Sequence, residues 1–291
     1  MDQQQKILKI KKKALEIRKR IVHMVYRAGS GHPGGSLSCA DVVACLYFPY
    51  RFSLLNVKRE NPKWEERDYL VLSKGHACPA VYAALAMREF FKKEHLYKLR
   101  KVGALLQGHA VSKVPGVDVS TGSLGQGLSV ACGIALGLKK LGKNSKVFAI
   151  VGDGECQEGQ IWEAANFAVS HKLDNLIVFV DHNHKQIMGS DKEVINHINN
   201  LRAKFSAFGW DTLAINGHNI EEIIDTTEGA KKLKNPVAIV MDTIKGKGVS
   251  VMEKHKNGWH GSPISFKIFR LAMKEFKEEE ERLKAEEEAL K

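Results

Sequence analysis

The sequence predicts an α/β protein in which a parallel sheet is covered by helices on both faces. Short apolar runs suited to strands alternate with longer segments of helical periodicity along most of the 291 residues. This βαβ alternation gives parallel strands joined by right-handed crossovers. Hydrophobic residues make up 44% of the chain, which supports a substantial core. We expect residues 1–265, including an amino-terminal helix, to form one domain and residues 266–291 to form a charged helix or tail.

The first expected element is a long amphipathic helix over residues 4–28, because its apolar residues recur at helical spacing. It should stop at Gly29. Residues 30–35 read SGHPGG, which is too rich in glycine to continue a helix, and they are expected to form a loop that holds His32. Lysine and arginine crowd the helix and contribute to a net charge of +12, which raises nucleic acid as a partner. Because no aromatic residues interleave with the charges of residues 6–20, we prefer a solvated helix face.

Helices and one short strand should follow, up to residue 141. The expected elements are a helix at 40–48, a strand at 69–72, a helix at 79–91 and a helix at 128–141. His76 follows the strand closely and should lie at its carboxyl end. The glycine-rich run at 116–127 cannot be a P-loop, because it lacks the Gly-Lys-Ser/Thr ending.

Two strand ends in the middle of the chain point to a ligand. Residues 146–151 and 176–180 are apolar runs typical of strands, the first ending in Gly-Asp-Gly around Asp153 and the second followed closely by Asn183. Open α/β sheets bind ligands where neighbouring strands end. The oxygens of Asp153 and Asn183 suit Mg²⁺, which usually completes its shell with phosphates and water, and Gly154 lets the backbone approach an anion. The sequence therefore predicts a Mg²⁺-diphosphate ligand.

The same alternation continues towards the carboxyl terminus. Residues 211–216 and 237–243 read as strands with a helix at 220–233 between them. Ile244 lies at a further strand end. The final segment, from Lys274, is almost all charge and helix-forming residues with a thin apolar stripe, so we expect a solvated helix or a frayed tail.

Six short motifs together resemble transketolases. They are SGHPGG at 30–35, LSKGHACP at 72–79, LQGHA at 106–110, TGSLGQG at 121–127, GDGECQEGQIWEA at 152–164 and TIKGKG at 243–248. The GDG triplet followed at this distance by Asn183 also resembles the thiamine diphosphate fingerprint. The order and spacing match over residues 6–263, which is far more specific than any single motif. The resemblance implies a thiamine diphosphate-binding fold.

The resemblance also implies cofactors and residue roles. The cofactors would be thiamine diphosphate and Mg²⁺, or another divalent cation such as Ca²⁺ or Mn²⁺. The implied catalytic residues are His32, His109, His260, Glu158 and Glu163, the two glutamates matching acids at the transketolase subunit boundary. The implied cofactor-binding residues are His76, Gly122, Ser123, Leu124, Asp153, Gly154, Glu155, Asn183, Ile244 and His260. The cation would be held by Asp153, Asn183 and the backbone carbonyl at Lys185.

One departure from full-length transketolases is informative, because this sequence stops after the first of their domains. In the family a second domain binds the aminopyrimidine, and the active site forms between the two. We therefore expect the amino-terminal subunit of a split transketolase that acts on sugar phosphates in the pentose phosphate pathway. Its partner would be a carboxy-terminal, pyrimidine-binding subunit, with two copies of each chain.

Two other functions remain open from the sequence. The chain could belong to another thiamine diphosphate enzyme such as 1-deoxyxylulose-5-phosphate synthase, although the SKGHACP and TIKGKGV motifs look more like transketolase. A non-catalytic, basic nucleic-acid-binding protein would leave the histidine loops unexplained.

The sequence also bears on where the protein is located. No apolar run approaches the roughly 20 residues of a membrane span. The amino terminus lacks a signal peptide, and five cysteines without a CxxC pair suit a reducing compartment. We expect a cytoplasmic protein with no membrane or nucleic-acid partner.

Overall fold

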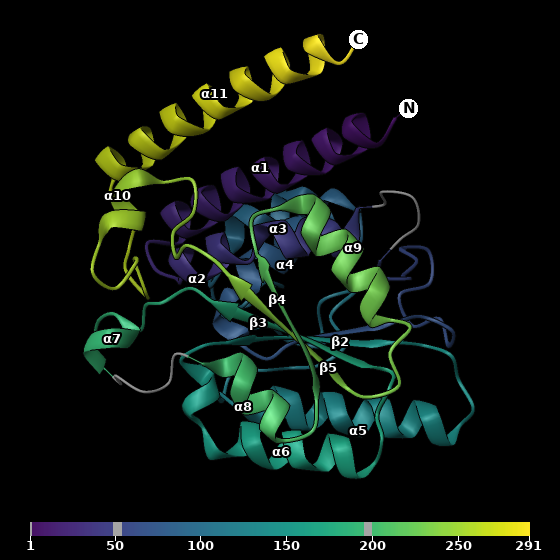
Figure 1. Ribbon diagram of the computed structural model, residues 1–291. Helices are drawn as coiled ribbons and strands as arrows, with labels where there is room; N and C mark the ends of the chain where they lie inside the picture. The colour runs from purple at the N-terminus through teal and green to yellow at the C-terminus, as the bar shows by residue number, and fades with distance from the viewer. Residues whose placement is uncertain (1, 49–53, 195–199) are drawn as a thin grey trace.

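The computed structural model describes residues 2–48, 54–194 and 200–291, and it contains the expected parallel sheet (Figure 1). The strands are β1 (Tyr69–Leu72), β2 (Val147–Gly152), β3 (Leu176–His182), β4 (Asp211–Asn216) and β5 (Val237–Asp242). They lie in the order β1-β2-β3-β5-β4, and each neighbouring pair is parallel. The predicted fold class is confirmed.

Helices cover both faces of the sheet, because its strands bury side chains on both sides. The helices are α1 (Gln3–Ala28), α2 (Pro33–Ser38), α3 (Ala40–Tyr47), α4 (Cys78–Met87), α5 (Gln126–Lys140), α6 (Gly159–Ser170), α7 (Asp191–Val194), α8 (Leu201–Ala207), α9 (Ile220–Ala230), α10 (Ser250–Lys254) and α11 (Phe266–Ala289). Phe148 and Ile150 of β2 pack with α1, α3, α4 and α9. Val147 and Ala149 belong to a second core cluster with residues of α5, α6 and α8. Figure 1 shows these three helices on the opposite face of the sheet from α1, α3 and α4.

The amino-terminal helix α1 is fixed at both ends by its own sequence. Asp2 and Gln5 form a capping box, in which each side chain accepts a hydrogen bond from the backbone N–H of the other. At the other end Gly29 adopts the left-handed conformation, with φ of +65°, and stops the helix as expected. The apolar stripe that includes Ile17 and Ile21 is fully buried.

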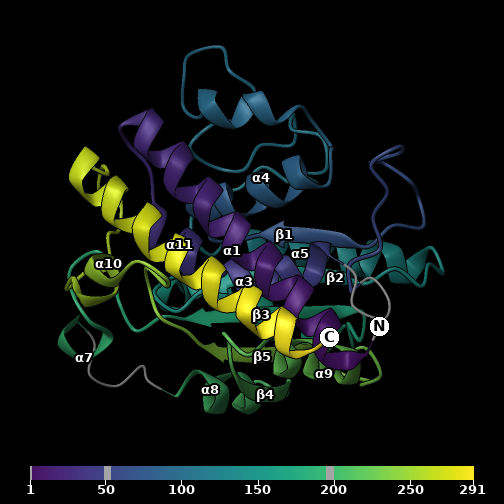
Figure 2. The ribbon, with the colours of Figure 1, turned by 90° about the horizontal axis from the view of Figure 1, so that it is seen from above.

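Helix α11 differs from the expected solvated helix or frayed tail, because it lies along α1 (Figure 2). Its Ala272, Phe276 and Leu283 are buried, and Phe269 stacks on Tyr26 of α1 with ring centroids 4.3 Å apart. Charges complete the seam between the two helices, with Lys11–Glu286 at 2.7 Å, Lys12–Glu287 at 2.7 Å and Lys19–Glu280 at 3.0 Å. The thin apolar stripe therefore packs, and three of the amino-terminal lysines face acidic partners.

The glycine-rich segment after α1 also differs from the prediction. Pro33 begins α2, so Gly34 and Gly35 are helical and only the residues up to His32 form a connection. A Cβ on Gly34 would lie 1.8 Å from the carbonyl oxygen of Gly258. Glycine is needed there for close packing, while proline suits the first helical position because its φ is already helical.

The remaining chemical features concern membranes and thiols. Among the described residues, no helix combines the length and the apolar character needed to cross a membrane. All five cysteines are free and buried. Burial raises the pKa of Cys156, beside the Gly-Asp-Gly turn, well above its usual value. That thiol is therefore inert packing rather than a nucleophile.

Candidate active site

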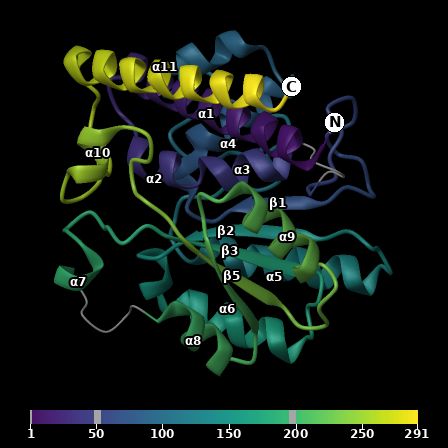
Figure 3. The ribbon, with the colours of Figure 1, turned by 45° about the horizontal axis from the view of Figure 1, so that its top comes forward.

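The loops that follow β1, β2, β3 and β5 meet at one edge of the sheet. The strand register places Gly152 of β2 beside Asp181 of β3, and His182 beside Asp242 of β5. Figure 3 shows α2, α7 and α10 gathered at this edge. Because loops from neighbouring parallel strands converge there, it is the ligand-binding edge of such sheets.

Four histidines from distant parts of the chain form a cluster at this edge. His32 immediately precedes α2, and His76 lies in the single 3₁₀ turn after β1. The ring centroid of His32 lies 5.2 Å from that of His76 and 5.4 Å from that of His260. His109 lies 6.2 Å from His32, and His76 lies 5.2 Å from His260. The three histidines predicted to be catalytic are thus brought together with one predicted to bind the cofactor.

The environment keeps these rings neutral near pH 7. Burial, reinforced by nearby positive groups, lowers the pKa of His32 to about 4. Burial and the charge of Lys245 lower the pKa of His260 to about 3, and burial and Lys74 lower that of His76 well below its usual value. His32 Nδ1 is buried and has no hydrogen-bond partner within the described chain. A buried, positively biased pocket with an unpaired ring nitrogen fits an anionic group such as a diphosphate.

Two lysines that the sequence analysis did not assign are buried at the strand ends. Burial would lower the pKa of Lys74, but its ion pair with Asp181 raises that pKa to about 12. Lys245 is only 2% exposed, and its Nζ donates to the Lys185 carbonyl at 2.7 Å and lies 2.8 Å from His260 Nδ1. Burial lowers the pKa of Lys245 to about 8. The carbonyl predicted to bind a cation thus already accepts one hydrogen bond. The place of each lysine just after a strand end was a signal for the site, although their burial had no local signal.

Asp153 carries buried negative charge directly after β2. Its Oδ1 accepts a hydrogen bond from the Gly154 amide at 2.8 Å. Burial, and then the charge of Asp181, raise the pKa of Asp153. The amide of Asn183 donates to Asp181 at 3.3 Å, and its Oδ1 accepts only a long bond of 3.4 Å from the Lys185 N–H. A carboxylate whose charge is costly, beside an amide oxygen with spare capacity, is a donor set that fits Mg²⁺.

Glu155, predicted to bind the cofactor, has its carboxylate engaged by the protein. It is 3% exposed and accepts hydrogen bonds from Ser73 Oγ at 2.5 Å, the Gly125 amide at 2.9 Å and the Gly152 amide at 3.0 Å. These bonds tie the glycine-rich loop to the ends of β1 and β2. The carboxylate thus positions the glycine-rich loop, and the role of Glu155 in cofactor binding stays a prediction.

The other predicted residues are exposed. They are Gly122, Ser123, Leu124, Ile244, Glu158 and Glu163. A Cβ on Gly122 would lie 3.6 Å from the His109 ring, so this loop borders the histidine cluster. Leu124 and Ile244 are 37% and 40% exposed, which leaves two apolar side chains open to a ligand or a second protein chain. The roles of all six stay predictions.

The sequence and the fold are both similar to those of known transketolases. The family described as "Transketolase, thiamine diphosphate binding domain" matches residues 10–279. The 6-deoxy-6-sulfo-D-fructose transketolase subunit SqwG of Clostridium sp. (strain MSTE9) is 44% identical over 265 residues, covering 90% of this chain and 94% of the relative. An apulose-4-phosphate transketolase subunit of Phocaeicola vulgatus is 40% identical over 270 residues, covering 92% and 94%.

The solved structure of Campylobacter jejuni transketolase superposes on this chain with a TM-score of 0.85 at 33% identity. The match covers 95% of this chain but only 43% of that protein, so the chain spans less than half of a full-length transketolase. It corresponds instead to nearly the whole of the two relatives named as subunits. The chain therefore belongs to the transketolase family, as an amino-terminal, thiamine diphosphate-binding transketolase subunit.

Proposed function

We propose that this chain supplies the diphosphate-binding half of an active site that moves a two-carbon ketol unit from a ketose phosphate to an aldose phosphate. The observation that carries the proposal is the convergence of the four histidines, Lys245 and Asp153 at one edge of the sheet. Thiamine diphosphate, when bound, supplies the electron sink for breaking and making the carbon–carbon bond. The protein must hold the diphosphate, exclude water and move protons.

The diphosphate and its cation are assigned to the buried groups. Lys245, His76 and His260 donate to the phosphate oxygens. Burial is the largest cause of the lowered pKa of each, so a phosphate anion would stabilise the protonated form that burial disfavours. Asp153 and Asn183 hold Mg²⁺, or Ca²⁺ or Mn²⁺ in its place, with the backbone carbonyl two residues after Asn183 as a third ligand. Phosphate charge then offsets the positive potential of the site.

Proton transfer is assigned to His32 and His109, whose ring centroids lie 6.2 Å apart in the cluster. Both have lowered pKa values through burial, so both are neutral near pH 7 and can accept a proton from a sugar hydroxyl. His109 contacts the glycine-rich loop at Gly122, which places it where the outer part of a sugar would lie.

A second subunit is proposed to complete the site by binding the aminopyrimidine ring. The naming of both relatives as subunits, with 94% of each covered, supports this arrangement. Exposed Leu124, Ile244, Glu158 and Glu163 would meet that subunit or a second copy of this chain, and we expect two copies of each chain. Five free thiols suit a cytoplasmic location.

The test is reconstitution with the carboxy-terminal subunit from the same source. Ketol transfer from xylulose 5-phosphate to ribose 5-phosphate is measured with Mg²⁺ and thiamine diphosphate for each chain alone and for the mixture. Because one relative is named for 6-deoxy-6-sulfo-D-fructose and another for apulose 4-phosphate, both sugars are included as donors. Activity with at least one ketose is expected only in the mixture.

Matched variants connect the reaction to the site. Asp153→Asn should abolish transfer, whereas Asp174→Asn, a partly exposed aspartate remote from the cluster, should leave it unchanged. Turnover of pyruvate in place of a ketose would overturn the proposed reaction in favour of a decarboxylating synthase. Family-like activity of the isolated chain would overturn the two-subunit site.

A further inference from the structure

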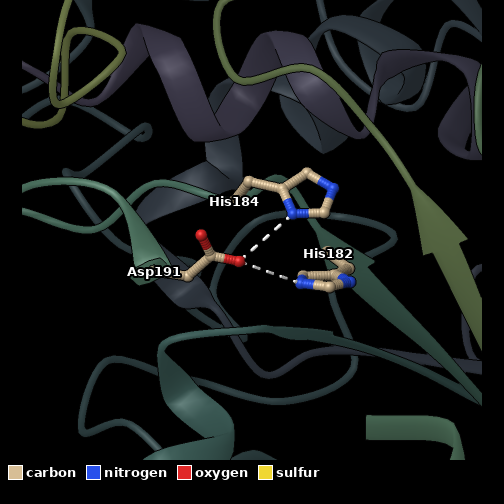
Figure 4. Close-up of side chains that lie close together, drawn as sticks. All are labelled: His182, His184 and Asp191. Carbon is tan, nitrogen blue, oxygen red and sulfur yellow. Dashed lines mark hydrogen bonds and ion pairs between the residues drawn. The ribbon is translucent and has the colours of Figure 1, made fainter. Parts of the chain in front are cut away.

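Two histidines and an aspartate form a compact cluster beside, but separate from, the Asp153 site (Figure 4). Figure 4 shows His182 and His184 turning their rings towards one carboxylate oxygen of Asp191. His182 Nε2 lies 3.4 Å and His184 Nδ1 lies 3.2 Å from that oxygen, and the three atoms all lie within 4.8 Å of one another. The proposed chemistry of thiamine diphosphate uses none of these side chains.

The backbone holds Asp191 opposite the histidines. The loop from His184 to Asp191 folds back on itself, because the Gln186 amide donates to the Gly189 carbonyl at 2.7 Å and the Asp191 amide donates to the His184 carbonyl at 3.0 Å. The other Asp191 oxygen, Oδ1, accepts the Lys192 amide at 2.8 Å. Only Oδ2 is left to face the two rings, so the three donor atoms are preorganised.

A second carboxylate orients one of the rings. His184 Nε2 lies 2.6 Å from Asp242 Oδ1, at the end of β5, and donates its proton to that carboxylate. In the neutral ring this tautomer turns the Nδ1 lone pair towards the Asp191 oxygen. Two lone pairs facing one another at 3.2 Å need a positive group between them, either a proton or a metal ion.

The distances are compatible with a shared metal ion. A charge-assisted N–H···O bond is usually about 2.7–2.9 Å long, which is shorter than both contacts here. Two ligands that are each about 2.0–2.1 Å from a tetrahedral Zn²⁺ lie about 3.3–3.4 Å apart. The separations of 3.2 and 3.4 Å are close to this ligand–ligand spacing. His182 Nε2 and His184 Nδ1 lie within 4.8 Å of each other, so both rings can turn towards a shared ion.

We propose that His182 Nε2, His184 Nδ1 and Asp191 Oδ2 form a site for a transition-metal ion of the Zn²⁺ class. Two imidazoles select such an ion over Mg²⁺, which prefers oxygen ligands. Asp242 is the second carboxylate that orients a metal-bound histidine. The fourth position is left for water or a ligand. Because the His184 amide donates to Asp153 at 2.8 Å and Asn183 lies between the histidines, this ion fixes the loop that carries the predicted Mg²⁺ ligands.

The test is a calorimetric titration with Zn²⁺. Bound metals are first removed from the full chain, and excess Mg²⁺ is then present throughout the titration. One Zn²⁺ per chain is expected. Co²⁺ serves as a second probe, because a tetrahedral site gives it strong visible absorption. Asp242→Asn should weaken Zn²⁺ binding about tenfold, while Asp191→Asn and His184→Gln, which each remove a ligand, should weaken it further. Circular dichroism of each variant verifies that it is folded.

Two control variants separate this site from other histidines. His171→Gln changes an exposed histidine at the end of α6 and should leave Zn²⁺ binding unchanged. His260→Asn disrupts the four-histidine cluster, which is the competing location for the ion. Undiminished Zn²⁺ binding in folded Asp191→Asn and His184→Gln would mean that these residues form only a proton-bridged ion pair, and it would overturn the proposal. Loss of binding in His260→Asn alone would likewise overturn it.

Discussion

The seam between α1 and α11 and the carboxyl edge of the sheet both gather charges, but they hold them in opposite ways. At the seam each lysine faces a glutamate at 2.7–3.0 Å, and every side chain is partly in water. At the sheet edge Lys245 and Asp153 are nearly fully buried, and their pKa values are displaced towards the neutral forms. Each lysine at the seam has a glutamate partner and stays partly hydrated, so its charge costs little free energy. The buried charges at the sheet edge are only partly neutralised by their neighbours, which suits a site that receives a charged ligand.

The sheet edge itself contains an internal contrast. Lys74 and Asp181 form a closed pair, in which the carboxylate also accepts the Ser38 hydroxyl at 2.6 Å and that of Thr243. Among the described residues, Lys245 instead has two neutral hydrogen-bond partners, the Lys185 carbonyl and His260. We therefore expect the Lys74–Asp181 pair to stabilise the fold and Lys245 to bind the ligand.

The largest effect is expected from Lys74→Met. This change leaves the Asp181 carboxylate, which is fully buried, without its counter-charge, and breaking such a pair costs about 3–5 kcal/mol. Urea denaturation of the isolated chain measures the loss in unfolding free energy. The double variant Lys74→Met/Asp181→Asn should recover much of it, because the stranded charge is gone. An equal loss in the single and double variants would mean that the lysine acts through packing.

Lys245→Met should separate ligand binding from stability. Its pKa of about 8 reflects a charge that burial disfavours, so the unfolding free energy should change little. Thiamine diphosphate affinity should fall roughly 10–100-fold, which is about 1.4–2.7 kcal/mol. Calorimetry with Mg²⁺ and thiamine diphosphate measures it, with Lys247→Met, a more exposed lysine of the same motif, as the matched control. Unchanged affinity in Lys245→Met would remove this lysine from the cofactor site.

A smaller effect should appear in the pH dependence of stability. His32 and His260 have folded pKa values of about 4 and 3, below the unfolded value of 6.5. Between the folded and unfolded pKa values, the unfolded chain binds more protons than the folded chain. The stability that is present above pH 6.5 is therefore lost as the pH falls towards the folded pKa values. Each ring should contribute about 1 kcal/mol between pH 7 and 5, after allowance for its partial exposure.

Urea denaturation at pH 7 and 5 measures this pH effect. His32→Gln and His260→Asn should each flatten the dependence, while His171→Gln, an exposed histidine, should not. Pyrophosphate should reduce the acid loss in the unmodified chain, because an anion in the site stabilises protonated rings. Identical slopes in all three variants would show that carboxylates dominate the pH dependence.

Local sequence patterns were enough to predict the sheet and its binding edge. Residues 69–72 and 211–216, expected as strands, are β1 and β4, because apolar or β-prone runs bounded by polar turns have few alternatives. The expected approach of Asp153 and Asn183 is also confirmed, since β2 and β3 are parallel neighbours whose ends lie level. Because the two strands are parallel neighbours, residues that follow each of them in the sequence come together at the same edge of the sheet.

Features that depend on long-range packing could not be predicted in the same way. Lysine is normally exposed, so nothing local showed that Lys74 and Lys245 are buried. The need for glycine at position 34 comes from its close approach to Gly258, more than two hundred residues away. The packing of α11 on α1 depends on matching a thin apolar stripe and acidic residues with a basic helix at the other end of the chain.

The smallest effect is expected at the α1–α11 seam. A double-mutant cycle with Lys19→Met and Glu280→Gln should give a coupling energy below about 1 kcal/mol, because both side chains are partly exposed and water screens their attraction. Urea denaturation at low and high salt measures it, and the coupling should shrink as salt is added. A coupling of several kcal/mol that resists salt would mean that the seam holds its charges as the sheet edge does, and would remove the contrast between the two regions.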